Sequence, residues 1–256
     1  MAQYASLSEP DPEWLKLGPI PSLYTTDIVE FRNTWNAMCD SANSQVEIDD
    51  CFCLGSLNDN DKMLRSLAED LRITCVSVDY RKAPETPFPA SLDDDYAGLK
   101  WALANAKNIS LDISKGVLIG GLSAGGNLSA VIAQKSLRDD EIRGKITGQL
   151  LISPFLLYHT AYPDRWKSEL LSKKQNEDAM ILPDKALELY TDLCNVRRSM
   201  IGAYLGDKPE NAFNPDFSPL LAHSFEGLPP AYIQIAGCDP LRDEAFYTAN
   251  FLKRLV

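Results

Sequence analysis

The sequence predicts an α/β fold with a doubly wound, mostly parallel sheet, and two features of the chain support this prediction. Short apolar segments rich in β-branched residues alternate with longer segments of helical periodicity, which is the order of strands and helices in such sheets. The chain has 256 residues, long enough to bury one sizeable core. No linker, repeat or low-complexity tract divides it, so we expect a single domain over residues 1–256.

Four segments have the length and composition of parallel strands buried on both faces. Residues 73–78 read Ile-Thr-Cys-Val-Ser-Val, and residues 116–120 hold Val-Leu-Ile between two glycines. Residues 146–152 are a largely apolar run that ends at a Ser-Pro pair, and residues 231–236 follow two prolines. We expect the carboxyl ends of these strands to form the edge of the sheet at which ligands bind in such folds.

Helical periodicity is found between and around these strands. The segment from Asp59 to Leu71 carries its apolar residues on one face, as an amphipathic helix does. Further helices are predicted at residues 22–38, 92–104, 125–137 and 244–256, and residues 168–204 are polar and helical with several candidate breaks.

The composition excludes several classes of function. The net charge is −11, so nucleic acid and anionic membrane surfaces are poor partners. No apolar run approaches the roughly 18 residues that a membrane span needs, and the amino terminus does not resemble a secretory signal, which favours a cytoplasmic location. The six cysteines are scattered and there are only two histidines, so we expect reduced thiols and no metal site.

The most informative local motif is Gly121-Leu122-Ser123-Ala124-Gly125, which lies between a predicted strand and a predicted helix. This placement is typical of a nucleophile elbow, in which the serine backbone is strained. Gly121 and Gly125, two residues before and after the serine, should avoid clashes with the adjacent strand and helix. The amide of Ala124 can then face a developing oxyanion at the start of the helix. The alternative is that the glycines form only a tight turn and Ser123 caps the helix.

Three blocks of the sequence together resemble the hormone-sensitive-lipase-like esterases. They are GGLSAGGNL at residues 120–128, VDYRKAPE at residues 78–85 with PFPA at residues 87–90, and GLPPA at residues 227–231 followed by DPLRDE at residues 239–244. The blocks occur in the order that the family has. The resemblance covers roughly residues 52 to 256.

The resemblance implies an α/β-hydrolase fold with a helical cap, here at about residues 168–206, and hydrolysis of small carboxylic esters without a cofactor. It assigns the nucleophile to Ser123 and the catalytic acid to Asp239, which follows the last predicted strand and comes after the serine, as in α/β-hydrolases. Asp239 could also cap the helix after it, and the two roles are compatible. Arg81 and Glu85 are interpreted as an ion pair that braces a turn.

Two features depart from the family's pattern. The family has a His-Gly-Gly-Gly segment, a source of oxyanion amides, just before the aromatic residue that matches Phe52. Here residues 48–51 read Ile-Asp-Asp-Cys, and the stretch from Met38 to Phe52 is short of the family's first strands by about 30 residues. The chain also ends before the position of the family's catalytic histidine, which neither His159 nor His223 matches. We therefore expect a fold that is incomplete at its first strands and at its carboxyl end, and little or no activity.

Two hypotheses of different classes follow. The first is a serine esterase for short-acyl, and in particular acetyl, esters; the chain resembles fungal members most, some of which, such as the versiconal hemiacetal acetate esterases, remove acetyl groups from polyketide intermediates. In its mechanism Ser123 attacks the ester carbonyl, a histidine takes the proton, Asp239 orients the histidine and Ala124 helps to hold the oxyanion. A substitute base at His159 is the weaker variant of this hypothesis. The second is a non-catalytic protein that binds small molecules on a degenerate esterase fold.

Overall fold

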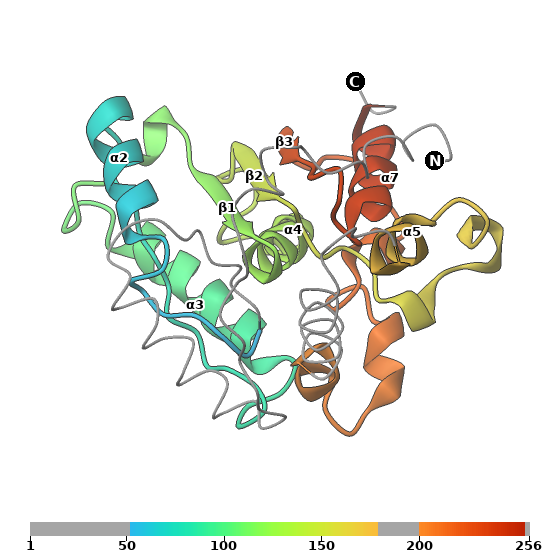
Figure 1. The fold of residues 1–256 in the computed structure, drawn as a ribbon. Coiled ribbons are helices and arrows are strands. Elements are labelled where there is room, and N and C mark those ends of the chain that lie inside the picture. Colours follow the sequence, from blue (N-terminus) through green and yellow to red (C-terminus); the bar gives the residue numbers. More distant parts are fainter. Residues whose placement is uncertain (1–51, 179–199, 254–256) are drawn as a thin grey trace, which may run out of the picture.

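The computed structural model describes residues 52–178 and 200–253 of the chain (Figure 1). In that part of the chain three parallel strands form one sheet, in the order β1-β2-β3. The strands are β1 (Leu118–Leu122), β2 (Gly148–Ile152) and β3 (Ala231–Gln234). They confirm three of the four predicted strands and the parallel sheet, with small differences at the strand ends.

Helices alternate with these strands as the sequence predicts. Helix α3 (Ala90–Ala104) precedes β1, α4 (Ala124–Ser136) follows it, and α7 (Arg242–Lys253) follows β3. Helix α2 (Asp61–Leu71) confirms the amphipathic helix expected there. Among the described residues no helix has the length and apolar character that crossing a membrane requires.

The polar segment expected to be helical is described only in part. Helix α5 (Ser172–Asp178) lies near its start, and residues 200–205 are helical near its end. The helix predicted at residues 22–38 lies outside the described residues, as do residues 179–199. Short 3₁₀ helices complete the regular structure of the described part: η3 (Ile113–Lys115), η4 (His159–Ala161), η5 (Asp164–Trp166), η6 (Pro209–Phe213) and η7 (Pro219–Leu221).

Helix α4 forms the centre of the core, where it packs against β1 and β2. It is buried along nearly its whole length, and Val131 has no exposed surface. Small residues allow this close packing, since a Cβ built on Gly126 would lie 2.9 Å from Pro154. A helix with apolar and small residues on all sides is typical of such a buried position.

An aromatic cluster adjoins this helix and anchors the first described residues. Phe52 stacks on Tyr204 with 3.8 Å between the ring centroids, and both rings lie against Phe217. Phe155, from the loop after β2, meets Phe217 edge-on. The cluster therefore packs four segments that are distant in sequence around the carboxyl ends of β1 and β2.

The two faces of the sheet differ in their exposure. Leu151 of β2 points to the face that the helices cover and is 1% exposed. Leu118 and Tyr232 point to the opposite face, because residues paired across parallel strands share a face, and they are 69% and 66% exposed. Helices α4 and α7 line a common cavity with Gln149 and Leu151, so both lie on the covered face. A doubly wound sheet is covered by helices on both faces, and in the described part of the chain we find helices on one face.

The strand predicted at residues 73–78 does not form, and this prediction is wrong. Ile73 and Val76 are 43% and 44% exposed, and Val78 lies against α3, where a Cβ built on Gly98 would come within 2.8 Å of its side chain. A strand needs a neighbour that satisfies its backbone hydrogen bonds, and among the described residues β1 pairs with β2 alone. The β-branched composition indicated a strand but could not supply its partner.

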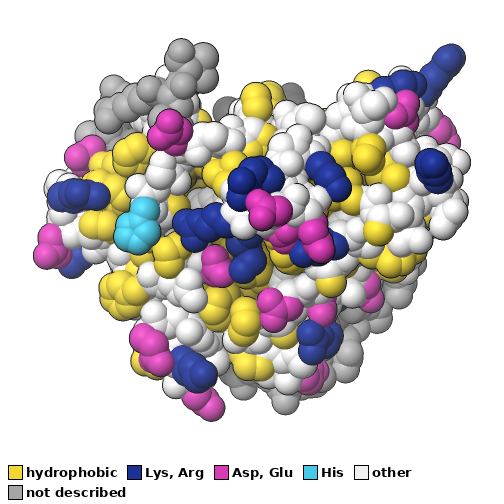
Figure 2. Space-filling view, turned by 180° about the vertical axis from the view of Figure 1, so that it is seen from behind, with side chains coloured by type: hydrophobic (Ala, Val, Ile, Leu, Met, Phe, Trp, Pro, Cys, Tyr) yellow, Lys and Arg dark blue, Asp and Glu magenta, His cyan; other side chains and the backbone are white. Residues whose placement is uncertain are grey.

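The exposed sheet face leads us to expect self-association of this chain. Exposed apolar sheet surface and the edge of β1 that pairs with no described strand favour contact between copies. On the face that Figure 2 shows, hydrophobic patches lie among interspersed Lys, Arg, Asp and Glu side chains. The double substitution Leu118→Lys/Tyr232→Lys should increase the monomer fraction several-fold in size-exclusion chromatography with light scattering. Phe213→Lys, at a residue on η6 that is 60% exposed, should not; an equal effect of both would refute a role for this face.

Candidate active site

Ser123 occupies the turn between β1 and α4 with a strained backbone. Its φ of 52° and ψ of −106° lie outside the conformations that a residue with a side chain normally adopts, which confirms the strain expected of an elbow. The Ser123 amide donates to the Ile152 carbonyl at 2.9 Å. The Ser123 carbonyl accepts from the amides of Asn127 and Phe155, both at 3.1 Å. The next strand, the loop after it and the helix thus hold the strained residue in place.

The side chain of Ser123 does not act as a helix cap. It makes no capping hydrogen bond to α4, although the residue directly precedes the helix. The alternative interpretation of the motif as a capped turn therefore loses its main support. Ala124 is the first helical residue and is 2% exposed. The first amides of a helix have no carbonyl partner within it and lie at the positive end of its dipole, where an oxyanion is stabilised.

The glycines of the motif have unequal roles. A Cβ built on Gly121 would lie 2.6 Å from the backbone carbon of Gly125, closer than real Cβ atoms come. Gly120 is equally constrained, because its Cβ would lie 2.6 Å from the Leu150 carbonyl oxygen. A Cβ on Gly125 would meet nothing within 4 Å among the described residues. The expectation that a side chain would clash is confirmed at Gly121 and wrong at Gly125. The backbone of Gly125 is what a side chain at Gly121 would strike.

Asn127 is a positioning residue that the sequence analysis missed. It is fully buried in the first turns of α4. Its side-chain amide donates to the Phe155 carbonyl at 2.7 Å and to the Phe217 carbonyl at 2.9 Å. These bonds hold two loops beside the serine turn. A carboxamide side chain among the small and apolar residues of the first turns of α4 was the available signal.

Asp239 lies in the loop between β3 and α7, at the edge of the sheet at which Ser123 lies. Its Oδ1 accepts from the Leu241 amide at 2.8 Å, and its carbonyl accepts from the Asn176 side chain at 2.9 Å. The carboxylate therefore orders the turn that leads into α7, but the helix begins only at Arg242, so Asp239 does not directly precede it as a cap would. Ser123 and Asp239 follow strands that are two positions apart, so about 10 Å separates the strands that carry them. We predict that the two side chains lie within the reach of one intervening imidazole.

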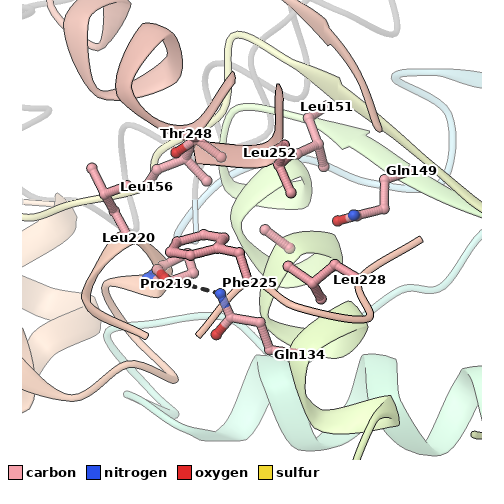
Figure 3. Close-up of a pocket in the computed structure, with 11 residues that line it drawn as sticks. Gln134, Gln149, Leu151, Leu156, Pro219, Leu220, Phe225, Leu228, Thr248 and Leu252 are labelled. Carbon is pink, nitrogen blue, oxygen red and sulfur yellow. Dashed lines mark hydrogen bonds between the residues drawn. The ribbon is translucent and has the colours of Figure 1, made fainter. Parts of the chain in front are cut away.

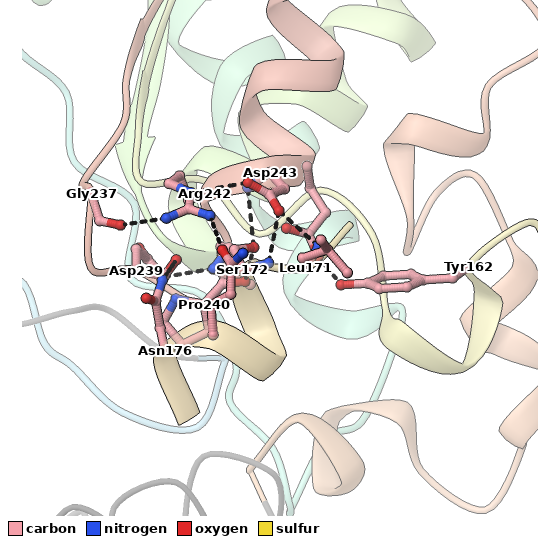
Figure 4. Close-up of polar contacts among 12 residues, drawn as sticks. Tyr162, Leu171, Ser172, Asn176, Gly237, Asp239, Pro240, Arg242 and Asp243 are labelled. Atoms are coloured by element: carbon pink, nitrogen blue, oxygen red, sulfur yellow. Dashed lines mark hydrogen bonds and ion pairs between the residues drawn. The ribbon is translucent and has the colours of Figure 1, made fainter. Parts of the chain in front are cut away.

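A buried ion pair follows the acid. Arg242 and Asp243 at the start of α7 have no exposed side-chain surface, and 3.0 Å separates Arg242 Nε from Asp243 Oδ1. Asp243 Oδ2 accepts from the amides of Leu171 and Ser172, at 2.8 and 2.7 Å (Figure 4). Arg242 also donates to Gln175 of α5 at 2.5 Å. The first turns of α5 and α7 are therefore fastened together beside the acid loop.

The other titratable side chains near the site add no second nucleophile. Burial raises the pKa of the Cys238 thiol, which keeps this neighbour of Asp239 protonated. The ring of His159, in η4, lies edge-on to Tyr158 with 4.4 Å between the centroids. His223 is exposed in the loop after η7. No group of three His, Cys, Asp or Glu side chains within the described ranges could hold a metal ion.

The ion pair expected between Arg81 and Glu85 is replaced by another. Arg81 binds Asp94 of α3, with Nη2 2.8 Å from Oδ1 and Nε 2.8 Å from Oδ2, and its own amide donates to the same carboxylate. The aspartate, which α3 presents to the turn, offers both carboxylate oxygens to the guanidinium. The turn is therefore braced against the helix.

A small cavity lies away from the serine. It has a volume of about 10 Å³, room for about one water, between α4, α7 and the covered sheet face (Figure 3). Leu151, Leu156 and Phe225 give it apolar walls, and Gln134 at its rim donates to the Pro219 carbonyl at 2.9 Å. Neither Ser123 nor Asp239 lines it. The cavity is a packing defect of the core, too small for a substrate.

A parallel sheet with a strained serine between a strand and a helix defines an α/β-hydrolase. The chain belongs to the alpha/beta hydrolase fold family, whose sequence model matches residues 50–255.

Known proteins support this assignment. Carboxylesterase NlhH of Mycobacterium tuberculosis is 36% identical over 207 residues, which are 78% of this chain and 57% of the relative. Versiconal hemiacetal acetate esterase of Dothistroma septosporum is 30% identical over 204 residues, 79% of this chain and 58% of the relative. The crystal structure of vibralactone cyclase superposes with a TM-score of 0.75 at 28% identity, over 97% of this chain and 84% of that one. This chain spans 50% to 58% of the length of the curated relatives it matches.

Proposed function

We propose that the chain is a serine carboxylesterase with Ser123 as the nucleophile. The observation that carries the proposal is the strained backbone of Ser123, held between β1 and α4 without a capping bond from its side chain. Strain of this kind persists only where surrounding structure enforces it and is concentrated at functional sites. Relatives named as carboxylesterases support the reaction class.

In the proposed reaction, the Ser123 hydroxyl attacks the ester carbonyl and its proton passes to a base. The Ala124 amide donates to the oxyanion that forms, and Asp239 orients the base. Collapse of the intermediate breaks the bond to the alcohol oxygen, which takes the proton back from the base, and leaves an acyl group on Ser123. Water then attacks this acyl group and releases the acid and the free serine hydroxyl. Neither His159 nor His223 matches the family's base, and residues 48–51 lack its glycine amides. We therefore expect slow turnover by this chain.

The substrates that we propose are short-acyl esters, acetates in particular. The support is the relative from Dothistroma septosporum, whose name specifies an acetate ester. By the same relationship we propose a role in fungal secondary metabolism. We further propose that residues 168–206 form a helical cap on a single domain and shape the acyl pocket. Its described helix α5 is bonded to the acid loop through Asn176.

The proposal predicts that p-nitrophenyl acetate leaves one acetyl group on Ser123. An activated ester needs little help from a base to acylate the serine, and slow deacylation lets the acyl-enzyme accumulate. Intact-protein and peptide mass spectrometry should detect the group on the wild type and on Ser114→Ala, a matched change at an exposed serine, but not on Ser123→Ala. Longer acyl esters should label more slowly.

Two results would contradict the esterase proposal. Acetylation that persists in Ser123→Ala would place the reactive group elsewhere. Reversible binding of esters without any labelling of Ser123 would favour the non-catalytic binding protein instead.

A further inference from the structure

Helix α7 carries a buried carboxyl group that the proposed reaction does not use. Glu244 lies in the first turn of α7 and is 1% exposed. Its Oε1 accepts a hydrogen bond from the phenol of Tyr162, which reaches the start of α7 from the segment after η4 (Figure 4). Its Oε2 is buried without a hydrogen-bond partner among the described residues. A carboxylate that is buried with one oxygen unpaired is costly, so the protonated form is favoured.

The charges around Glu244 also oppose its ionisation. The negative charges of Asp243, on the same helix, and of Asp239, in the preceding loop, raise the pKa of Glu244. The nearby cation Arg242 directs its guanidinium to Asp243 and to the neutral Gln175 of α5. An ionised Glu244 would therefore add a third carboxylate charge to a site that already holds two.

The hydrogen bond from Tyr162 to Glu244 joins the two segments that flank the candidate active site. Tyr162 directly follows η4, in the segment whose start donates the Phe155 amide to the Ser123 carbonyl. Glu244 belongs to the helix that begins just after Asp239. Whatever weakens this bond loosens the contact between the segment beside the serine and the segment beside the acid.

We propose that Tyr162 and protonated Glu244 form a pH-sensitive clasp, which holds the segment after η4 to α7 at acidic pH. The clasp opens when Glu244 ionises, because burying the carboxylate charge costs more than the stronger bond from Tyr162 returns. The clasp does not depend on ester hydrolysis, because it consists of two side chains outside the reacting groups. It makes the geometry around Ser123 and Asp239 responsive to pH.

The direction of the effect follows from the protonation of Glu244. Burial chiefly, with the two aspartates, raises its pKa from 4.5 to about 7 against the opposing effect of the Tyr162 bond. The folded chain therefore binds a proton more tightly than the unfolded chain. The stabilisation is fully present below pH 4.5, and it is lost as the pH rises through about 7.

Urea unfolding between about pH 6 and pH 8.5 tests the clasp. The folding equilibrium constant of the wild type should fall by about tenfold more over this range than that of Glu244→Gln, whose neutral amide does not titrate. Glu226→Gln, at an exposed glutamate, should keep the wild-type pH dependence. Tyr162→Phe, which removes the donor to Oε1, should retain a drop and move it to higher pH.

A second measurement covers the case in which Glu244→Gln fails to fold. In the wild type labelled with ¹³C at glutamate carboxyl groups, one resonance should titrate near pH 7 and keep titrating in Tyr162→Phe at higher pH. The proposal is overturned if every glutamate carboxyl titrates below about pH 5.5, near the ordinary range. Equal pH dependence of wild type and Glu244→Gln would overturn it as well.

Discussion

Gly121→Ala is expected to destabilise the folded chain by about 3 kcal/mol. The added methyl group would lie 2.6 Å from the backbone carbon of Gly125 and 2.9 Å from its carbonyl oxygen. These are backbone atoms at the start of α4, which cannot rotate away as a side chain can. The strand and the helix would have to separate, and the separation would disturb the turn that holds Ser123.

Gly125→Ala is the matched control, four residues away. Its methyl group would meet nothing within 4 Å in the described part of the chain, and alanine is the better residue inside a helix by about 0.5–1 kcal/mol. Urea denaturation of both variants should therefore give effects of opposite sign. Equal destabilisation by the two changes would refute the one-sided contact between β1 and α4.

Asp243→Ala is expected to cost about 3–5 kcal/mol, the range seen when one partner of a buried ion pair is removed. The change would leave the Arg242 guanidinium buried with its carboxylate missing. It would also remove the acceptor of the Leu171 and Ser172 amides at the start of α5. Both losses should lower the free energy of unfolding, which chemical denaturation measures.

The control for the ion pair is an exposed one. Arg65 and Asp61 of α2 lie 2.6 Å apart with both side chains exposed, and Arg65→Ala should leave the denaturation midpoint almost unchanged because solvent screens such pairs. The loss of stability in Asp243→Asn should lie between those of Arg65→Ala and Asp243→Ala, since the amide oxygen of Asn can still accept from the backbone amides. If Asp243→Ala proved as mild as Arg65→Ala, the buried network would not contribute to stability.

The site was more predictable from sequence than its supports were. The order strand, Gly121-Leu122-Ser123, helix is a local pattern, although bonds from Ile152 and Phe155 help to hold the strained turn. The topology rule that parallel strands end at one edge placed Asp239 at the same edge as Ser123. The roles of Asn127 and of the pair Arg242–Asp243 were not predicted, because their bonding partners are distant in sequence. The partners of Asn127 are 28 and 90 residues away, and those of Asp243 are about 70 residues away.

The sequence by itself determined the elements whose signals are local. Periodicity predicted α2, α3, α4 and α7, and apolar runs predicted β1, β2 and β3, since these patterns depend only on nearby residues. The family blocks determined which serine stands in the turn.

Only the tertiary structure decided what pairs with what. Residues 73–78 have the composition of a strand, but a strand exists only with a bonded neighbour, and none of the described strands pairs with them. Arg81 pairs with Asp94 and not with Glu85, which is nearer in sequence, because α3 presents both carboxylate oxygens of Asp94 to the guanidinium. The exposed sheet face and the buried acid Glu244 likewise depend on which elements cover them. Burial and partnership are properties of the packed chain, and residues distant in sequence supply them.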